Sequence, residues 1–308
     1  MIIFQSKGCS LVFCAFILLA LQVAAPAYAQ LTSGDRLPAA LKDIKTAGGV
    51  CRTDDAAGSP NGSVAGFVAQ PDFGCAISVN EVRRQMADPH VALIDLRSAS
   101  EHQAFHIESS LNIDLAVLRS KPYWRDKSLI LIGGGRLDQE IYASCARLKQ
   151  VGYKRVGVLR GGMLAWLTQD QAVVGRPVSP QQQARLSDAE FWQGSQSDSA
   201  FLVISKEQSA FQAEFPLSIV LQHVSPETLR TAVERRRKAA RSPKLMSVIL
   251  IVNPGVSDEQ IRNWQQLILP ETLLVYTEGQ EAYRRQVAIQ KAILSAQARG
   301  PKQPRCGS

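Results

Sequence analysis

The amino-acid sequence predicts an α/β protein whose mainly parallel sheets are covered by helices on both faces. Short, purely apolar runs such as 129–132 and 248–252 alternate with amphipathic stretches, as expected for strands buried on both faces. Stretches about 110–120 residues apart can be laid over each other, which indicates two copies of one fold. The 308 residues are 45% hydrophobic and 20% charged. This composition excludes disordered, collagen-like and coiled-coil classes and is sufficient for two domains.

Residues 1–29 are expected to be a secretory signal peptide that lies outside the fold. Lys7 precedes the apolar run 11–21, and Ala27-Tyr28-Ala29 has the small-residue pattern of a cleavage site. The run is shorter than the roughly 20 residues that cross a bilayer, so we expect no stable membrane anchor. An uncleaved anchor is the alternative. The mature protein is therefore expected to be periplasmic or secreted.

Residues 30–76 are predicted to form an N-terminal arm with few large apolar side chains. In an oxidising compartment, a disulfide between Cys51 and Cys75 would stabilise this arm by ~3 kcal/mol. Two unpaired thiols are one alternative to this pairing. A bridge to Cys306 in the C-terminal tail, residues 301–308, is another.

Cys145 is predicted to be buried. It falls on one helical stripe with Ile141 and Leu148, which is typical of a helix face turned toward the core. A buried thiol behaves as a small hydrophobic side chain, and we expect that role here rather than the role of a nucleophile.

The first α/β domain is predicted to cover residues 77–175. The segment Ser78–Glu81 has the spacing of a capping box at the start of a helix. Strands are expected at 91–96, 129–132 and 156–159. The second of these strands runs into a loop of three glycines and then a helix.

A polar, proline-containing linker, residues 176–185, is expected to lead into a second α/β domain, residues 186–300. Its sequence follows that of the first domain in the same order but more weakly, so we expect a degenerate copy. The match is strongest after the central strand, where 135–141 can be laid over 255–261 without a gap. The strands of this domain are expected at 201–204, 248–252 and 273–276.

Several motifs of the first domain together resemble the rhodanese (sulfurtransferase) homology domain, and they occur in the order of that family. The resemblance implies a rhodanese-like parallel sheet flanked by helices. With the internal repeat, it also implies two tandem copies, of which the second is degenerate. The segments that carry the resemblance are Ile94–Arg97, Phe105–Ile107, Leu111–Ile113, Gly152–Tyr153 and Leu159–Trp166.

The resemblance also implies where the reactive site lies. Active members carry a cysteine at the end of the central strand, where backbone N–H groups lower the pKa of the thiol and hold the persulfide. Here the nucleophile position is Gly133, with the register open as far as Gly135 because the loop is longer than is usual in the family. The matching position in the second domain is Asn253. Neither domain therefore has a catalytic nucleophile, and no neighbouring group can replace a covalent sulfur carrier.

The glycine loop remains a candidate anion-binding site. Gly133, Gly134 and Gly135 would allow several backbone N–H groups to face one small anion. Arg136 adjoins the glycines, and the resemblance places Arg97 at the mouth of the same pocket. A plain turn without a ligand is the alternative.

Two further residues are expected to support the pocket rather than react. The resemblance implies that Asp95 orients Arg97 or the backbone and that His106 makes a structural hydrogen bond. The four histidines and six cysteines show no metal-site spacing. No P-loop pattern of lysine and serine or threonine follows the glycines. We therefore expect neither a metal ion nor a cofactor.

A second charged feature is the basic run 230–244, in which Glu234 is the single acidic residue, in a chain of net charge +8. The simple interpretation is a solvated helix. The more specific interpretation is a surface that binds anionic lipid or an acidic partner. Nucleic acid is not expected as a partner, because the protein is expected to be exported and no aromatic residue interleaves with the run.

Two functions are compatible with these features. The first is a non-catalytic binding or scaffold module that holds a small anion in the loop or a periplasmic protein partner. The second is a sulfurtransferase that uses Cys306 or a cysteine of a partner in place of the missing nucleophile. The missing cysteine favours the first.

Overall fold

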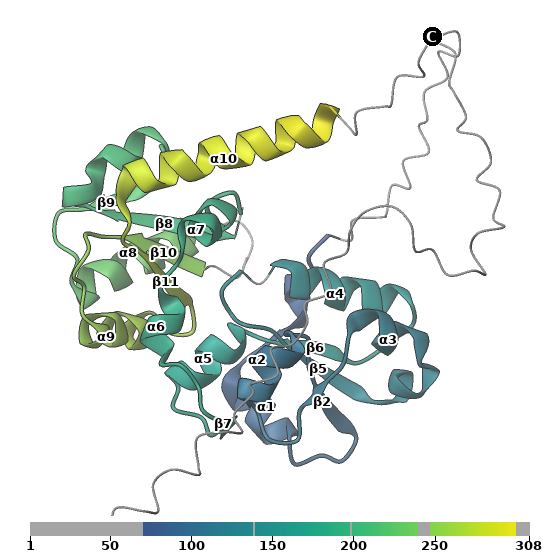
Figure 1. Ribbon diagram of the computed structural model, residues 1–308. Coiled ribbons are helices and arrows are strands. Elements are labelled where there is room, and N and C mark those ends of the chain that lie inside the picture. The colour runs from purple at the N-terminus through teal and green to yellow at the C-terminus, as the bar shows by residue number, and fades with distance from the viewer. Residues whose placement is uncertain (1–69, 138, 198, 240–246, 300–308) are drawn as a thin grey trace, which may run out of the picture. The chain divides into compact units, whose positions relative to one another are not determined.

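The computed structural model describes residues 70–137, 139–197, 199–239 and 247–299, which belong to one compact unit of the chain. They form two α/β regions, which we call the first region (residues 70–175) and the second region (residues 176–299). Each region contains one parallel sheet with helices on both faces (Figure 1). The fold class predicted from the sequence is therefore confirmed.

The main sheet of the first region has the strand order β1-β6-β5-β2-β4, and all neighbouring strands are parallel. β5 lies at its centre because its side chains are apolar toward both faces. Leu129 and Leu131 face one core, and Ile130 and Ile132 face the other. A separate antiparallel pair joins β3 to β7. The strands are β1 (Ala76–Ile77), β2 (Val91–Asp95), β3 (Phe105–His106), β4 (Leu111–Asn112), β5 (Ser128–Ile132), β6 (Val156–Leu159) and β7 (Val174–Gly175).

Helices on the two faces of this sheet complete two apolar cores. On one face, α3 and α4 contribute Leu118 and Leu148, and on the other, α1 and α5 contribute Val82 and Trp166. Burial of these side chains is the main stabilising contribution. The helices, with η for 3-10 helices, are η2 (Phe73–Cys75), α1 (Val79–Gln85), α2 (Ala99–Ala104), α3 (Leu115–Ser120), η3 (Pro122–Asp126), α4 (Gln139–Gln150) and α5 (Gly162–Thr168).

The sheet of the second region has the order β11-β10-β8-β9, again with parallel neighbours. A single parallel bridge between Arg185 and Val275 adds the start of a fifth strand beside β11. The strands are β8 (Ala200–Ser205), β9 (Ile219–Leu221), β10 (Ser247–Ile251) and β11 (Thr272–Tyr276).

The helices of the second region also form two layers. α8 and α9 pack on one face, and α7, η4 and α10 pack on the other through aromatic side chains. The ring of Phe191 stacks on that of Tyr276, with centroids 4.0 Å apart. Burial, and a hydrogen bond to Asp188, raise the pKa of Tyr276. The helices are α6 (Pro180–Ala184), α7 (Asp188–Ser195), η4 (Lys206–Ala213), α8 (Pro226–Ala239), α9 (Asp258–Ile268) and α10 (Gly279–Arg299).

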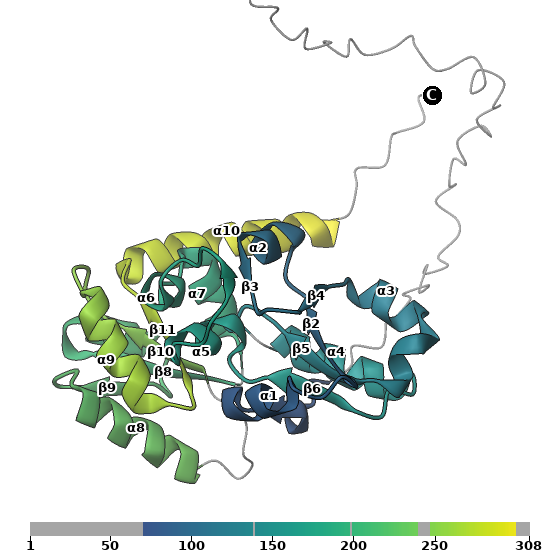
Figure 2. The same ribbon diagram turned by 90° about the horizontal axis from the view of Figure 1, so that it is seen from below.

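The two sheets share one strand order. The series β1-β6-β5-β2-β4 corresponds to the bridge at Arg185 followed by β11-β10-β8-β9. The central strands β5 and β10 therefore correspond. Gly133 directly follows β5, whereas Val252 separates Asn253 from the end of β10. Figure 1 and Figure 2 show a sheet with helices on both faces in each region.

The segment predicted to be a linker, residues 176–185, contains helix α6. Ser179 caps this helix by accepting a hydrogen bond from the backbone N–H of Gln182, and Pro180 occupies its first turn. Ala184 is buried in the core beneath α8 and α9. The second half of the predicted linker is therefore packed into the core of the second region.

The predicted disulfide between Cys51 and Cys75 is wrong, because Cys75 is bonded to Cys145 with an S–S distance of 2.05 Å. A disulfide requires neighbouring Cα atoms, and packing of η2 against α4 brings these two to 6.7 Å although 70 residues separate them. Cys145 is buried, as predicted, but it is half of this bridge rather than a free thiol. Cys51 lies outside the described residues.

Other sequence predictions also fall outside the described residues. They concern the signal peptide (1–29), the tail with Cys306, most of the arm, and the end of the basic run beyond Ala239. Within the part of the chain that the structure describes, no helix is long and apolar enough to cross a membrane.

Candidate functional site

A cavity of about 430 Å³ lies at the carboxyl ends of β2 and β5. Carboxyl ends of neighbouring parallel strands meet at one edge of a sheet, where open α/β folds bind their ligands. Leu96 and Arg97 follow β2, and Gly133 and Gly134 follow β5, so the predicted nucleophile position lies in the cavity wall. The other lining residues are Glu101, Asp114, Leu115, Leu137, Glu140, Ile141 and Ser144.

The backbone of the glycine loop is held by α5. Two backbone N–H groups at the start of α5 donate to the carbonyl oxygens of Gly133 and Gly134, at 2.9 and 3.2 Å. Gly135 has a left-handed φ of 87°, and a Cβ atom there would lie 1.9 Å from the carbonyl oxygen of Gly161. A Cβ atom at Gly134 would meet nothing within 4 Å. Packing thus fixes the loop, and Gly134 faces open space.

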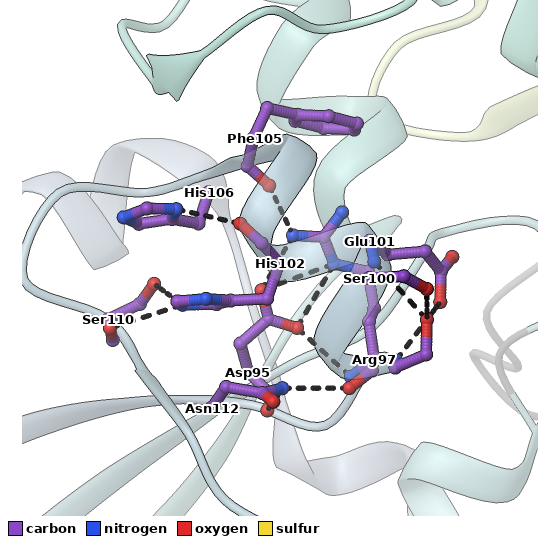
Figure 3. A network of polar contacts seen from close by, with 10 residues as sticks. Asp95, Arg97, Ser100, Glu101, His102, Phe105, His106, Ser110 and Asn112 are labelled. Atoms are coloured by element: carbon purple, nitrogen blue, oxygen red, sulfur yellow. Dashed lines mark hydrogen bonds and ion pairs between the residues drawn. The ribbon is translucent and has the colours of Figure 1, made fainter. Parts of the chain in front are cut away.

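Arg97 is nearly buried and bound to its neighbour in the Asp-x-Arg motif (Figure 3). Its Nη2 donates to Asp95 Oδ2 at 2.6 Å and its Nε to Asp95 Oδ1 at 3.0 Å. Nη2 also donates to the carbonyl oxygen of Phe105 at 2.8 Å. Asn112 Nδ2 donates to the carbonyl oxygens of both Asp95 and Arg97. Because a buried carboxylate balances the guanidinium, Arg97 carries little free charge toward the cavity.

His106 lies outside the cavity lining, beside α2 (Figure 3). Its Nδ1 lies 2.8 Å from the carbonyl oxygen of His102, and the two imidazole rings stack with centroids 4.1 Å apart. His102 Nε2 in turn lies 3.3 Å from both the carbonyl and the hydroxyl oxygen of Ser110. These contacts hold the chain between α2 and β4.

Arg136 extends from the glycine loop to the second region. Its Nη1 and Nη2 contact the two carboxylate oxygens of Glu190, at 2.8 and 2.9 Å, and Nη2 also donates to the carbonyl oxygen of Arg185. Leu137 packs beside Gly194 of α7. The two residues that follow the glycines therefore join the two regions, and Arg136 is not among the residues that line the cavity.

Three carboxylates in the cavity wall were not singled out by the sequence analysis, namely Glu101, Asp114 and Glu140. Each also makes a local hydrogen bond or ion pair that stabilises a helix. Asp95 balances Arg97, and Arg147 pairs with Glu140. The lining therefore keeps an excess of negative charge at Glu101 and Asp114. A small anion would gain less from this cavity than three glycines and two arginines suggest, and anion binding stays a prediction.

The corresponding loop of the second region carries no thiol or other strong nucleophile. Asn253 Oδ1 accepts a hydrogen bond of 2.6 Å from Gln208 Nε2, which connects the loop to η4. Gly255 has a left-handed φ of 95°, and Ser257 begins α9 with a capping box. Among the described residues of the whole chain, no group of three or more His, Cys, Asp or Glu side chains could hold a metal ion.

Comparison with protein families supports the resemblance for the first region. Residues 78–169 match the family model of the Rhodanese-like domain. The match includes β2, β5, β6 and the cavity at Gly133, so the first region contains a rhodanese-like domain. No curated protein matches the chain in sequence.

Several solved structures match the chain at low identity. A rhodanese-like domain from Anabaena sp. is 19% identical, covers 33% of this chain and 80% of its own, and has a TM-score of 0.30. The thiosulfate sulfurtransferase of Pseudomonas aeruginosa is 19% identical, over 68% of this chain and 42% of its own, with a TM-score of 0.29. The 3-mercaptopyruvate sulfotransferase of Escherichia coli is 15% identical, over 66% and 97%, with a TM-score of 0.27. At these identities and TM-scores, the activities of the matched proteins say nothing about the activity of this chain.

Proposed function

We propose that this protein is a binding or scaffold module that does not transfer sulfur through its rhodanese-like domain. One observation carries the proposal: Gly133 stands at the end of β5, in the cavity wall, where active members of the family have a cysteine. Sulfur transfer needs a covalently reactive atom at this place. Neither glycine nor a backbone N–H group can supply one.

The cysteines of the described residues support the same proposal. Cys75 and Cys145 are bonded to each other and are 3% and 0% exposed. A sulfur atom in a buried disulfide is not available as an attacking thiolate. A sulfurtransferase would therefore need Cys51, Cys306 or a cysteine of a partner.

We further propose that the cavity receives a polar or cationic group of a protein partner in preference to a small anion. The carboxylates Glu101, Asp114 and Glu140 raise the cost of bringing a second negative charge into the cavity. Arg97 and Arg136, which the sequence suggested as anion ligands, are occupied by Asp95 and Glu190.

The proposal also includes the relation between the two regions and the compartment in which the protein acts. The shared strand order supports the view that the second region is a degenerate second copy of the rhodanese fold. The buried disulfide supports an exported protein, because structural disulfides persist in oxidising compartments. Residues 1–29 would then be the signal peptide, and the periplasm or the exterior the place of action.

The test of the missing activity is a thiosulfate-to-cyanide transfer assay on the full chain, combined with mass spectrometry for a persulfide. We expect no turnover above a protein-free blank and no added sulfur. Turnover that disappears in Cys306→Ser or in Cys51→Ser would overturn the proposal and identify the carrier thiol.

The charge of the cavity has its own test. Titration of the wild-type protein with thiosulfate or sulfate, followed by calorimetry, should show no saturable binding. The Glu101→Gln/Glu140→Gln variant should bind these anions more strongly than wild type, because two of the three negative charges are gone. Saturable anion binding by wild type would restore the anion site predicted from the sequence.

A further inference from the structure

The amino end of the first sheet carries a cationic surface with one exposed aromatic side chain. It lies at the edge opposite Gly133, because it is formed by the chain that enters β5 and β6. We call this surface the basic edge. Its residues are Lys121, Tyr123, Arg125, Lys127, Lys154 and Arg155.

Contacts between two stretches of chain build the basic edge. β5 and β6 are parallel neighbours, so the residues in front of them lie side by side. Arg155 Nη2 donates to the carbonyl oxygen of Asp126 at 2.6 Å. The hydroxyl of the buried Tyr153 donates to the carbonyl oxygen of Leu118 at 2.5 Å and lies 3.3 Å from that of Lys121. The cations of both stretches therefore belong to one continuous surface.

Tyr123 stands on a fixed turn within the basic edge. Pro122 begins η3, and Trp124, which packs against the core, contacts the ring of Tyr123 edge-on with centroids 5.1 Å apart. Lys127 Nζ lies 5.8 Å from the centroid of the Tyr123 ring. The Tyr123 side chain is nonetheless 65% exposed. An exposed ring among cations is typical of residues that sit at a membrane–water interface.

The positive charge of the basic edge is only partly balanced by neighbouring carboxylates. None of its five cations makes an ion pair with a described residue. The acidic residues of the neighbouring turns are Asp126 and Asp88, and these two carboxylates are fewer than the five cations. The surface therefore keeps an excess of positive charge.

The basic run on α8 is the weaker candidate for an anionic partner. Arg237 is paired with Glu271 at 2.6 Å, and Arg236 lies over the ring of Phe201 at 5.9 Å. Phe201 itself is only 4% exposed. α8 thus offers fewer free cations, and this ring is buried rather than available to a partner.

We propose that the basic edge docks the protein on an anionic phospholipid surface, with the ring of Tyr123 among the head groups. Each Lys or Arg close to such a surface strengthens binding about fivefold. The residues of the basic edge line none of the cavities at Gly133, beside α6 or beside β9, so the proposal rests on their charge and on the exposed ring of Tyr123 rather than on a pocket. The proposal goes beyond the proposed function and does not depend on it.

The test is co-sedimentation of the full chain with phosphatidylcholine vesicles that contain or lack phosphatidylglycerol. Wild type should bind only the anionic vesicles, and added salt should weaken the binding. Lys121→Glu/Arg125→Glu should bind at least about 25-fold more weakly, because two contributions of about fivefold are lost. Tyr123→Ser should weaken binding by less, and this loss should persist as salt is raised.

Arg235→Glu/Lys238→Glu on α8 is the matched control, since it changes the net charge by the same amount at two exposed cations. It should bind like wild type. All variants carry the same residues 1–69, so any contribution of the apolar run 11–21 cancels, and urea unfolding checks that each variant is folded.

Three outcomes would overturn the proposal. The first is that wild type binds neutral and anionic vesicles equally, and the second is that the α8 control loses as much binding as the variant of the basic edge. The third is that wild type binds polyglutamate but not vesicles. The last result would assign the basic edge to an acidic protein partner.

Discussion

In each region, the segment in front of the first strand is attached to the helix that follows the central strand. The kind of attachment differs between the two regions. In the first region, Cys75 of η2 is bonded to Cys145 of α4. In the second, Gln265 of α9 occupies the place of Cys145 when the two helices are aligned. Its Nε2 donates to the carbonyl oxygen of Pro180 at 3.3 Å, and its Oε1 accepts from Gln181 Nε2 at 3.1 Å.

This difference shows that both regions need a contact that holds the segment in front of the first strand to a helix. β1 has only two residues, and the second region has a single bridge at Arg185 in its place. So few ladder hydrogen bonds do not offset the entropy lost when the segment is ordered. A covalent bond supplies the missing anchor in one region, and buried side-chain hydrogen bonds supply it in the other.

The loops after the central strands differ in a second way. Gly135 and Gly255 stand at equivalent positions with φ of 87° and 95°. The carbonyl oxygen of Gly161 would lie 1.9 Å from a Cβ atom at Gly135, whereas nothing lies within 4 Å of one at Gly255. Glycine thus meets a backbone requirement in both loops and a packing requirement in only one.

The largest effect is expected for Gly135→Ala, which should lower the free energy of unfolding by roughly 5 kcal/mol or prevent folding. Its methyl group would overlap a backbone oxygen that no side-chain rotation can remove. Gly255→Ala should cost only about 1–2 kcal/mol, the cost of the left-handed backbone. Urea unfolding measures both, with Gly134→Ala as a nearly neutral control. Equal losses at positions 135 and 255 would contradict the packing argument.

The disulfide should have the next largest effect. Cys75→Ala/Cys145→Ala should lower the free energy of unfolding by about 4 kcal/mol, because the bridge closes a loop of 70 residues in the unfolded chain. Reductant should destabilise wild type by a similar amount and leave the double variant unchanged, as measured by urea unfolding. Wild type that is equally stable with and without reductant would rule out the bridge as the anchor of the first region.

The smallest effect is expected in the second region. Gln265→Leu leaves the side-chain amide of Gln181 buried without its acceptor, which should cost about 1–2 kcal/mol in the same measurement. Gln181 and Gln265 are 3% and 2% exposed, so replacing both with leucine should recover part of the loss. If Gln265→Leu is as stable as wild type, the hydrogen bonds of α9 are not an anchor.

Strands and helix starts could be predicted because their signals are local. The run 129–132 is apolar at every position, and it became the central strand β5. Ser78 caps α1 by accepting a hydrogen bond from the backbone N–H of Glu81, as their spacing predicts, although the Glu81 side chain bonds Gln85 instead of completing the capping box. The helix α6 carries a comparable signal, since Ser179 caps it and Pro180 is in its first turn, but its polar composition suggested a linker instead.

The disulfide and the charge of the cavity wall could not be predicted, because they depend on residues that only the fold brings together. Cys75 meets Cys145 across 70 residues, so proximity in sequence to Cys51 was misleading. Arg136 adjoins the glycines in sequence, yet its side chain is paired with Glu190 of the second region. The carboxylates of the cavity wall likewise come from separate elements of the first region.

The position of Cys75 also has a mechanical consequence. Tension on the chain that precedes the first region would enter it through η2, directly in front of β1. Without a cross-link, such a pull would peel β1 from β6 one hydrogen bond at a time, at about 1 kcal/mol each. Through the bond to Cys145, the force passes instead to α4, which must leave the core as a whole. The first region is therefore expected to resist stretching from its amino-terminal side.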